Sequence, residues 1–471
     1  MDENCGVCGC SLENSQEAIY RMLLQLQHRG QLSAGITVYQ PQNHFLLKTY
    51  KNLGLVNDAF RTGSKSKFDS IMKNLSSKKA IGHVRYATSG VDDKAYAQPF
   101  EHVHGKKNRW FSISFNGNIA NYPQLRLDLE KSNYHLVRKT DTEVLLLLLA
   151  KSLKSKETIT NAFSDLSKHL DGSYNLALIN AEGTLVAARD PLGIKPLCYG
   201  EKNGEFAFAS ESVALQALGF HDVKDLEPGK ILIHKKGELK IEEFAKCEKK
   251  AHCFFEWVYF AHAASKMEGK IVYEVRNNLG RELAKLETEN LADDCVVIPV
   301  PDSSTPSANG FAEALRLPLR EGLIRNRYVG RTFIESKDRA ERVRSKFTVI
   351  TDIFKDKKVF LVEDSIVRGT TLKNLVKFIK EHGKPKEIHV RVSSPPILWP
   401  CFYGIDMSTR RELVAVNKTE SEIAKELNVD TVKYQSIKGL VKALGLPKND
   451  LCLACVNGKY PTKTGEERKN E

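Results

Sequence analysis

The sequence lacks any apolar run long enough to cross a membrane. Its longest strongly apolar run is Val144–Ala150, whereas a spanning helix needs about 20 such residues. The first residues, Met1–Asn4, are acidic and lead into no apolar stretch, which is the opposite of a signal peptide. Internal repeats and low-complexity tracts are also missing. We therefore expect a cytoplasmic protein with no membrane partner.

The charge excess lacks the pattern that nucleic-acid binding would require. The 471 residues include 71 Lys and Arg against 58 Asp and Glu, a formal net charge of +13. These cations are spread along the chain and are not interleaved with aromatic residues that could stack on bases. An excess of this kind equally attracts phosphorylated small molecules. We expect no nucleic-acid partner, and the length suggests two large domains.

Cysteine is too scarce for a disulfide scaffold in a chain of this length, yet its placement is uneven. Ten cysteines are present. In a reducing compartment they point to metal, cluster or nucleophile chemistry. Three gather at Cys5, Cys8 and Cys10, and two form a Cys-x-x-Cys pair at Cys452 and Cys455. The remaining ones are Cys198, Cys247, Cys253, Cys295 and Cys401.

The two halves of the chain have different patterns. In the first half, apolar spacing predicts a helix over Ser15–Arg29 that Gly30 stops. Short apolar runs at Ser112–Phe115, Leu176–Ile179 and Thr184–Ala188 predict strands of an α+β layered domain. The charge-dense stretch Lys235–Lys250 lacks apolar periodicity, and we expect the domain boundary there.

The second half alternates buried strands with helices. The strands are predicted at Cys295–Pro301, Val359–Val362 and Ile388–Val392. One helix is expected at about Phe311–Leu317, and another ends at Gly383. Strand, crossover helix and strand form the unit of a parallel α/β sheet, which binds ligands at the carboxyl ends of its strands.

The most informative segment is Val359–Thr371, in which an apolar strand ends in two carboxylates. Glu363 and Asp364 can bind a sugar diol or a hard metal ion. The loop that follows offers backbone amides, a glycine and the hydroxyls of Ser365, Thr370 and Thr371 at a helix start, where a phosphate is favoured. The alternative is an ordinary strand–turn–helix with a polar tip.

This segment resembles the fingerprint of phosphoribosyltransferases that bind phosphoribosyl pyrophosphate, and more narrowly that of the amidophosphoribosyltransferases. The likeness runs from Cys5 to about Pro461 and includes Val300–Ser304, Asn326–Ile334 and Ser393–Pro396. It implies a type I phosphoribosyltransferase α/β domain. By this resemblance, Glu363 and Asp364 bind the ribose hydroxyls, and Ser303 joins them near Mg²⁺ and pyrophosphate. The 5′-phosphate is then held by Ser365, Arg368, Gly369, Thr370 and Thr371.

The start of the chain, Cys5–Cys10, resembles that of class II glutamine amidotransferases, whose short leader is removed to leave cysteine first. A free α-amino group has a pKa of about 7.7–8.0, so it can act as the base for its own residue's thiol. The resemblance implies an N-terminal-nucleophile layered fold, with Cys5 as nucleophile once residues 1–4 are gone. Cys8 and Cys10 remain rival candidates on sequence alone.

The same resemblance supplies a glutamine pocket. Gly82–Thr88 matches the segment whose arginine binds the substrate carboxylate, which gives Arg85 that role. Phe115–Asn118 matches the oxyanion segment, with the Asn116 side chain and the Gly117 amide as donors. Thr140–Glu143 matches the family segment whose aspartate binds the substrate ammonium group, which gives Asp141 that role.

Four cysteines match positions at which iron–sulfur members of the family carry ligands. These are Cys253, Cys401, Cys452 and Cys455. The resemblance implies a structural [4Fe–4S] cluster, and a zinc ion bound by four thiolates is the alternative.

Some positions depart from the usual family pattern. Leu32 replaces an acid, His262-Ala263-Ala264 replaces Arg-Pro-Asp, and Glu363 replaces an Asp. The loop 335–346, which normally closes over phosphoribosyl pyrophosphate, is short and lacks the usual Pro and Gln. None of these changes removes the nucleophile or a cluster ligand.

We therefore predict two domains, 5–245 and 246–471, that transfer glutamine nitrogen to phosphoribosyl pyrophosphate at the first step of purine synthesis. The family also implies an ammonia path between the sites, a homo-oligomer, usually a tetramer, and feedback by purine nucleotides. Another class II amidotransferase would share the N-terminal motifs but lack Glu363–Thr371. A non-catalytic sensor of phosphoribosyl pyrophosphate would not need the glutaminase residues.

Overall fold

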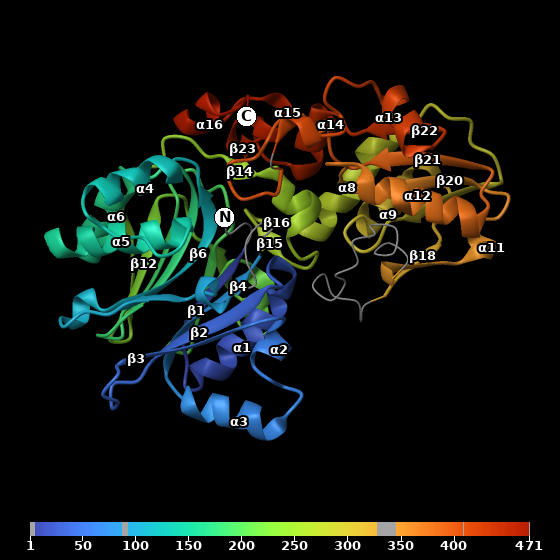
Figure 1. The fold of residues 1–471 in the computed structure, drawn as a ribbon. Coiled ribbons are helices and arrows are strands. Elements are labelled where there is room, and N and C mark those ends of the chain that lie inside the picture. Colours follow the sequence, from blue (N-terminus) through green and yellow to red (C-terminus); the bar gives the residue numbers. More distant parts are fainter. Residues whose placement is uncertain (1–4, 87–92, 327–344, 408, 471) are drawn as a thin grey trace.

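The first half of the chain forms two antiparallel sheets stacked face to face, with helices on both outer faces (Figure 1). The computed structural model describes residues 5–86, 93–326, 345–407 and 409–470. The seven-stranded sheet has the order β11-β9-β10-β1-β4-β2-β3 and the six-stranded sheet the order β13-β12-β8-β7-β6-β5. This confirms the layered fold expected for the N-terminal half.

The strands of the seven-stranded sheet are β1 (Gly6–Ser11), β2 (Ser33–Tyr39), β3 (Leu47–Leu53), β4 (Lys79–Arg85), β9 (Cys198–Lys202), β10 (Glu205–Ala209) and β11 (Val223–Asp225). Those of the six-stranded sheet are β5 (Phe100–His102), β6 (Phe111–Ile119), β7 (Gly172–Asn180), β8 (Leu185–Arg189), β12 (Lys230–Lys235) and β13 (Glu238–Glu243).

The alternation of side chains along each strand produces the layers. On β1, Val7 packs between the sheets, whereas Cys8 and Cys10 pack with Ile19 and Met22 of α1. The helices are α1 (Ser15–Gln25), α2 (Val56–Ala59), α3 (Lys65–Asn74), α4 (Tyr122–Lys131), α5 (Asp141–Ser155), α6 (Ile159–Ser167) and α7 (Ser212–Gln216), with short 3₁₀ turns at η1 (Gln27–Arg29), η2 (Lys94–Tyr96) and η3 (Lys107–Arg109). The predicted helix over Ser15–Arg29 is thus an α-helix followed by the turn η1.

The second half is built on a four-stranded parallel sheet with the order β17-β20-β21-β22. The strands are β17 (Cys295–Pro299), β20 (Lys358–Glu363), β21 (Glu387–Val392) and β22 (Thr431–Tyr434). Helices α12 (Thr370–Gly383) and α13 (Glu420–Leu427) cover one face, and α8 (Val272–Ala284) and α9 (Thr305–Leu315) cover the other. The predicted parallel α/β domain is confirmed.

Smaller elements complete this half. They are α11 (Thr351–Phe354), α14 (Ile437–Leu444), α15 (Ala454–Asn457), α16 (Lys463–Glu467), the strand pairs β14 (His252–Cys253) with β23 (Leu451–Cys452), β15 (Lys266–Met267) with β16 (Lys270–Ile271) and β18 (Leu323–Arg325) with β19 (Phe347–Val349), the π-helical turn η4 (Glu256–Phe260), and the 3₁₀ turns η5 (Arg410–Glu412) and η6 (Lys448–Asp450). No helix in the described ranges is both long and apolar enough to span a membrane.

Two local expectations needed correction. The helix expected at Phe311–Leu317 starts six residues earlier, at Thr305, because Pro306 in its first turn begins the helix without an apolar signal. The stretch Lys235–Lys250 contains the edge strand β13, whose side chains are largely exposed and therefore show no apolar alternation. The domain boundary placed there stays a prediction.

Candidate active sites and their family

The predicted nucleophile and the predicted carboxylate-binding arginine lie at the same end of two neighbouring strands. Cys5 is buried directly before β1, and Gly6 pairs with Val84 of β4. Arg85, the last residue of β4, is also buried, with its guanidinium carbon 5.5 Å from the centre of the Tyr96 ring. Residues 1–4 lie outside the described residues, as does the end of the Gly82–Thr88 motif.

The two rival cysteines occupy core positions. Cys8 and Cys10 are completely buried against α1. Burial raises the pKa of Cys8 well above its usual value and that of Cys10 to about 12. A thiol that rarely ionises is a poor nucleophile, which favours Cys5 over these two residues only as far as its α-amino group can act as base. The choice of Cys5 stays a prediction.

The predicted oxyanion residues reach toward the start of β1 from the other sheet. The Asn116 amide nitrogen donates to Ser210 Oγ at 3.5 Å, and the same oxygen accepts from the Val7 amide at 3.0 Å. Gly117 has a φ of +153°, and a Cβ there would lie 2.1 Å from the Ser173 carbonyl oxygen. A side chain at position 117 is therefore excluded by the close approach of β7.

Asp141 lies next to this segment, at the first turn of α5. Its carboxylate accepts hydrogen bonds from the Thr142 amide at 3.0 Å and from the Ile119 amide, at the end of β6, at 3.4 Å. Thr140 caps the helix by accepting from the Glu143 amide. Helix and strand therefore bring Asp141 close to Gly117 although 24 positions separate them in the sequence.

The predicted phosphoribosyl site is a cavity of about 730 Å³ at the carboxyl end of β20. It is lined by Glu363 to Leu372 and by residues from several other segments: Tyr86, Phe255, Tyr259, Phe260, Val300, Lys346, Phe347, Asn374, Leu375, Ile405, Asp406 and Glu412. This is where parallel sheets bind ligands. Most of the predicted closing loop 335–346 lies outside the described residues.

The carboxylate pair at the cavity is mutually repulsive, with Asp364 buried and Glu363 partly buried. Asp364 accepts hydrogen bonds from Ser303 Oγ at 2.5 Å and from Ser365 Oγ at 2.6 Å. Burial raises the pKa of Asp364, and these two hydrogen bonds oppose that rise. Burial and the adjacent Asp364 raise the pKa of Glu363 well above its usual value. A pair held in this way is stabilised by a cation, such as a hard metal ion.

The loop after the pair runs directly into α12. Gly369, with a φ of +73°, precedes the first turn of this 14-residue helix, so the amides that follow it point toward the cavity end. Arg368 forms ion pairs with Asp406 at 3.3 Å and Glu412 at 2.9 Å. Its charge is thus paired with two carboxylates at the rim of the cavity. Its role in binding the 5′-phosphate stays a prediction.

The four predicted cluster ligands come from three segments that meet near β14 and β23. Cys253 pairs directly with Cys452, and the Cys455 carbonyl accepts a hydrogen bond from the Leu398 amide near Cys401. Burial raises the pKa of Cys455 well above its usual value, and the other three thiols raise it further. Within the described ranges, no three His, Cys, Asp or Glu side chains converge to hold a metal ion.

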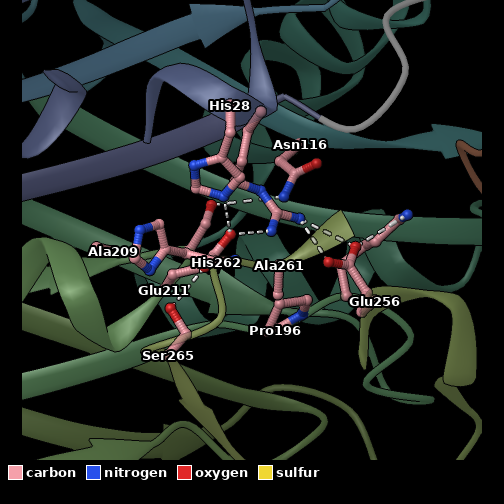
Figure 2. Close-up of polar contacts among 12 residues, drawn as sticks. His28, Asn116, Pro196, Ala209, Glu211, Glu256, Ala261, His262 and Ser265 are labelled. Carbon is pink, nitrogen blue, oxygen red and sulfur yellow. Dashed lines mark hydrogen bonds and ion pairs between the residues drawn. The ribbon is translucent and has the colours of Figure 1, made fainter. Parts of the chain in front are cut away.

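Sequence reasoning missed a buried ionic network between the two halves, centred on Arg29. Arg29 donates to both Glu256 oxygens at 2.9 Å and also to Glu211. Glu211 in turn accepts from His28 at 2.7 Å and from Ser265 at 2.6 Å. Figure 2 shows Glu256 on one side of the network and Glu211, His28 and Ser265 on the other. Arg29 lies three residues before Leu32, one of the positions noted in the sequence, but nothing in the sequence pointed to Glu256, 227 positions further on.

Two of the sequence departures adjoin these features. The Leu32 amide donates to the Arg85 carbonyl at 3.0 Å, so the residue that replaces an acid supports Arg85 through its main chain. The His262 amide donates to Glu211 at 2.8 Å. Neither departure removes a side chain predicted to contact substrate.

Family models match both halves of the chain. A glutamine amidotransferase domain matches residues 83–217, and a phosphoribosyl transferase domain matches residues 272–394. Together with the layered and parallel-sheet folds, these matches define a glutamine amidotransferase joined to a phosphoribosyltransferase.

Full-length relatives specify the family. An amidophosphoribosyltransferase of Methanocaldococcus jannaschii is 42% identical over 98% of this chain and 99% of its own, and one of Bacillus subtilis is 38% identical over 98% and 95%. The solved B. subtilis glutamine phosphoribosylpyrophosphate amidotransferase, complexed with ADP and GMP, superposes with a TM-score of 0.87 at 36% identity, covering 98% of each chain. The chain belongs to the amidophosphoribosyltransferase family, whose reaction is glutamine-dependent amidotransfer to phosphoribosyl pyrophosphate, the first step of purine biosynthesis.

Proposed function

We propose that the chain performs this family reaction at two separate sites, hydrolysing glutamine near Cys5 and using the ammonia at the Glu363–Thr371 cavity. The observation that carries the proposal is the wall of that cavity, which reaches Tyr86, the residue after Arg85. Tyr86 and Phe260 are in edge contact, with ring centres 6.0 Å apart. An assay of pyrophosphate release from phosphoribosyl pyrophosphate tests the proposal. Release is expected when glutamine or an ammonium salt is supplied, and no release is expected without a nitrogen source.

At the first site, the Cys5 α-amino group takes the thiol proton, and the thiolate attacks the glutamine amide carbon. The ammonium group returns this proton to the leaving nitrogen, so the C–N bond breaks and ammonia departs. Water then hydrolyses the resulting Cys5 thioester to glutamate and the free thiol. Arg85 binds the substrate carboxylate, and Asp141 binds its ammonium group. Asn116 and the Gly117 amide donate to the oxygen on which negative charge develops, a contribution of about 3–4 kcal/mol to lowering the barrier. Proton transfer by the α-amino group requires that residues 1–4 have been removed.

The active protein is therefore expected to begin at Cys5. A peptide bond before Cys5 would convert the base into an amide that cannot accept a proton near neutral pH. Intact-mass measurement of active preparations should give a chain shortened by four residues. Full activity of a chain that still carries Met1–Asn4 would contradict this assignment.

At the second site, the loop Ser365–Thr371 binds the 5′-phosphate through its amides and hydroxyls. Glu363 and Asp364 accept hydrogen bonds from the ribose diol and, with Ser303, are the residues that would hold Mg²⁺. The raised pKa values of the pair fit such a cation, because two adjacent carboxylates need a positive charge to stay ionised. Mg²⁺ held there would neutralise charge on the departing pyrophosphate. Ammonia then displaces pyrophosphate at C1.

The cysteine quartet, meaning Cys253, Cys401, Cys452 and Cys455, is proposed to hold a structural [4Fe–4S] cluster. Cys253 and Cys452 are buried, and Cys401 and Cys455 are partly buried. Burial and the neighbouring thiols raise the pKa of Cys253, Cys452 and Cys455, so a strongly positive centre is needed for these thiols to ionise together. Four thiolates suit either an iron–sulfur cluster or zinc, and the cluster is the centre that the family resemblance favours. In either case the centre ties three chain segments together.

We expect about four iron and four sulfide per chain after anaerobic purification, because a cubane is held by four cysteine thiolates. Loss of the centre should loosen the segment around Cys452–Cys455, since structural metal binding is part of the folding free energy. Metal and sulfide analysis together with visible absorption checks this. A colourless, iron-free, zinc-replete preparation with full activity would decide for zinc.

Regulation and assembly complete the proposal. The solved B. subtilis relative is complexed with ADP and GMP, and a second relative, 36% identical with a TM-score of 0.89, is described as the allosteric regulatory enzyme of purine biosynthesis. We propose that purine nucleotides also inhibit this chain and that it acts in the cytoplasm as a homo-oligomer, a tetramer by family resemblance.

A further inference from the structure

A fully buried lysine lies between the cysteine quartet and the interdomain network. Lys195 belongs to the connection between β8 and β9, and its ammonium is 3.2 Å from Glu256 Oε1. The residue before it, Ile194, accepts a hydrogen bond of 3.0 Å from the Cys253 amide. Lys195 is therefore fixed by the main chain beside one predicted cluster ligand while its side chain binds Glu256.

Glu256 continues the connection to the N-terminal domain. It lies three residues after Cys253, at the start of η4, and its two oxygens accept from Arg29 (Figure 2). Arg29 also donates from Nε to the Cys5 carbonyl oxygen at 3.2 Å. A continuous series of contacts thus runs from Cys253 through Lys195, Glu256 and Arg29 to the main chain of Cys5.

The burial of these charges makes the series sensitive to any change within it. The side chains of Lys195 and Arg29 are 0% exposed and that of Glu256 is 1% exposed. In such an environment a charge is barely screened by water, and removal of one partner leaves the other uncompensated. The Lys195 ammonium also lowers the pKa of Cys253 and Cys452, against the rise that burial produces.

We infer that Lys195 is a positioning residue that couples the cysteine quartet to the Cys5 nucleophile through Glu256 and Arg29. The inference rests on the proposed roles of Cys5 and of the quartet. With its negative thiolates in place, the quartet holds Lys195, Lys195 orients Glu256, and Glu256 sets Arg29 against the Cys5 carbonyl. Ammonia added to the solution reaches the phosphoribosyl cavity without this series of contacts, so ammonia-dependent synthesis does not depend on Lys195.

The experiment compares Lys195→Met with Lys195→Arg in the full-length protein. The probe is 6-diazo-5-oxo-L-norleucine, a glutamine analogue that alkylates the nucleophile. The measured quantity is the rate of Cys5 alkylation. Lys195→Met should slow alkylation about 10-fold or more, the usual effect of losing an outer-shell partner, while ammonia-dependent synthesis changes less than about twofold. Lys195→Arg keeps the charge and should restore most of the rate.

A second reading reports on the quartet itself. Removal of a nearby positive charge should shift the reduction midpoint of the cluster to a more negative potential in Lys195→Met but not in Lys195→Arg. A merely structural lysine would change both synthesis reactions equally and leave the potential unshifted. Alkylation of Lys195→Met at the wild-type rate overturns the inference.

A double substitution keeps the test decisive if Lys195→Met alone fails to fold. Lys195→Met combined with Glu256→Gln removes one cation and one anion, so no lone charge stays buried, yet the series to Arg29 is cut. This double variant should also alkylate slowly, and a wild-type rate overturns the inference. Wild-type protein that fails to react with the probe would instead contradict the proposed glutaminase site, and wild-type protein that holds no iron would contradict the proposed cluster.

Discussion

Replacement of the nucleophile, Cys5→Ala, should abolish glutamine-dependent synthesis of phosphoribosylamine and leave ammonia-dependent synthesis intact. The thiolate is the only group in the proposed mechanism that attacks the amide, so its loss should lower the glutamine-dependent rate at least about 10³-fold. Synthesis from ammonium salts at raised pH should persist, because free ammonia carries the lone pair that attacks C1. Pyrophosphate release with each nitrogen source measures both rates.

The rival cysteines serve as matched controls. Cys8→Ala and Cys10→Ala remove equally buried thiols from β1, the strand that Cys5 directly precedes, so they should retain glutamine-dependent activity in correctly folded protein. Loss of activity in Cys8→Ala together with retention in Cys5→Ala would move the nucleophile to Cys8. Loss of the ammonia-driven reaction in folded Cys5→Ala would contradict the separation of the two sites.

Replacement of one cavity carboxylate, Asp364→Asn, should impair synthesis from either nitrogen source. Asp364 is proposed to bind the ribose diol or its metal, so loss of its charge should lower both rates about 10²-fold or more. Basal glutaminase should survive in part, because Cys5, Arg85, Asn116 and Asp141 are unchanged. Glutamate release without phosphoribosyl pyrophosphate and pyrophosphate release with it separate the two effects.

A control for this change lies at the opposite end of the same sheet. Asp294 immediately precedes β17, where its carboxylate pairs with the exposed Lys386 at 3.1 Å. Exposed pairs of this kind contribute little to stability, so Asp294→Asn should leave both reactions unchanged. If Asp364→Asn left both syntheses untouched, the phosphate loop would have to be reassigned as a regulatory site.

Much of the fold was predictable because its buried strands and helices carry strong local patterns. β20 combines four completely buried apolar residues with a carboxylate end, and α12 has a clear apolar face that ends at Gly383. By contrast, β13 is an exposed edge strand, and the first turn of α9 is rich in small and polar residues. Such segments show little periodicity in their apolar residues, so the sequence predicted neither the strand β13 nor the correct start of α9.

The residues of the candidate sites were likewise predictable only in part. Motifs such as Glu363–Thr371 were recognisable because their residues are adjacent in the chain. The contacts that join the halves were not recognisable. Arg29 and Glu256 meet across 227 positions, and Lys195 lies in a segment to which the sequence assigned no role. Long-range ion pairs depend on tertiary packing, which local patterns do not encode.

The central claim, that nitrogen released near Cys5 reaches the phosphoribosyl cavity within one protein, has a direct test. The wild-type enzyme would be supplied with amide-¹⁵N glutamine, phosphoribosyl pyrophosphate, Mg²⁺ and an excess of unlabelled ammonium at neutral pH, and the product would be followed by nuclear magnetic resonance during turnover. We predict phosphoribosylamine that carries ¹⁵N in spite of the unlabelled excess. Product in which the label is diluted to the isotope ratio of the solution, or glutamate release without any phosphoribosylamine, would contradict the account.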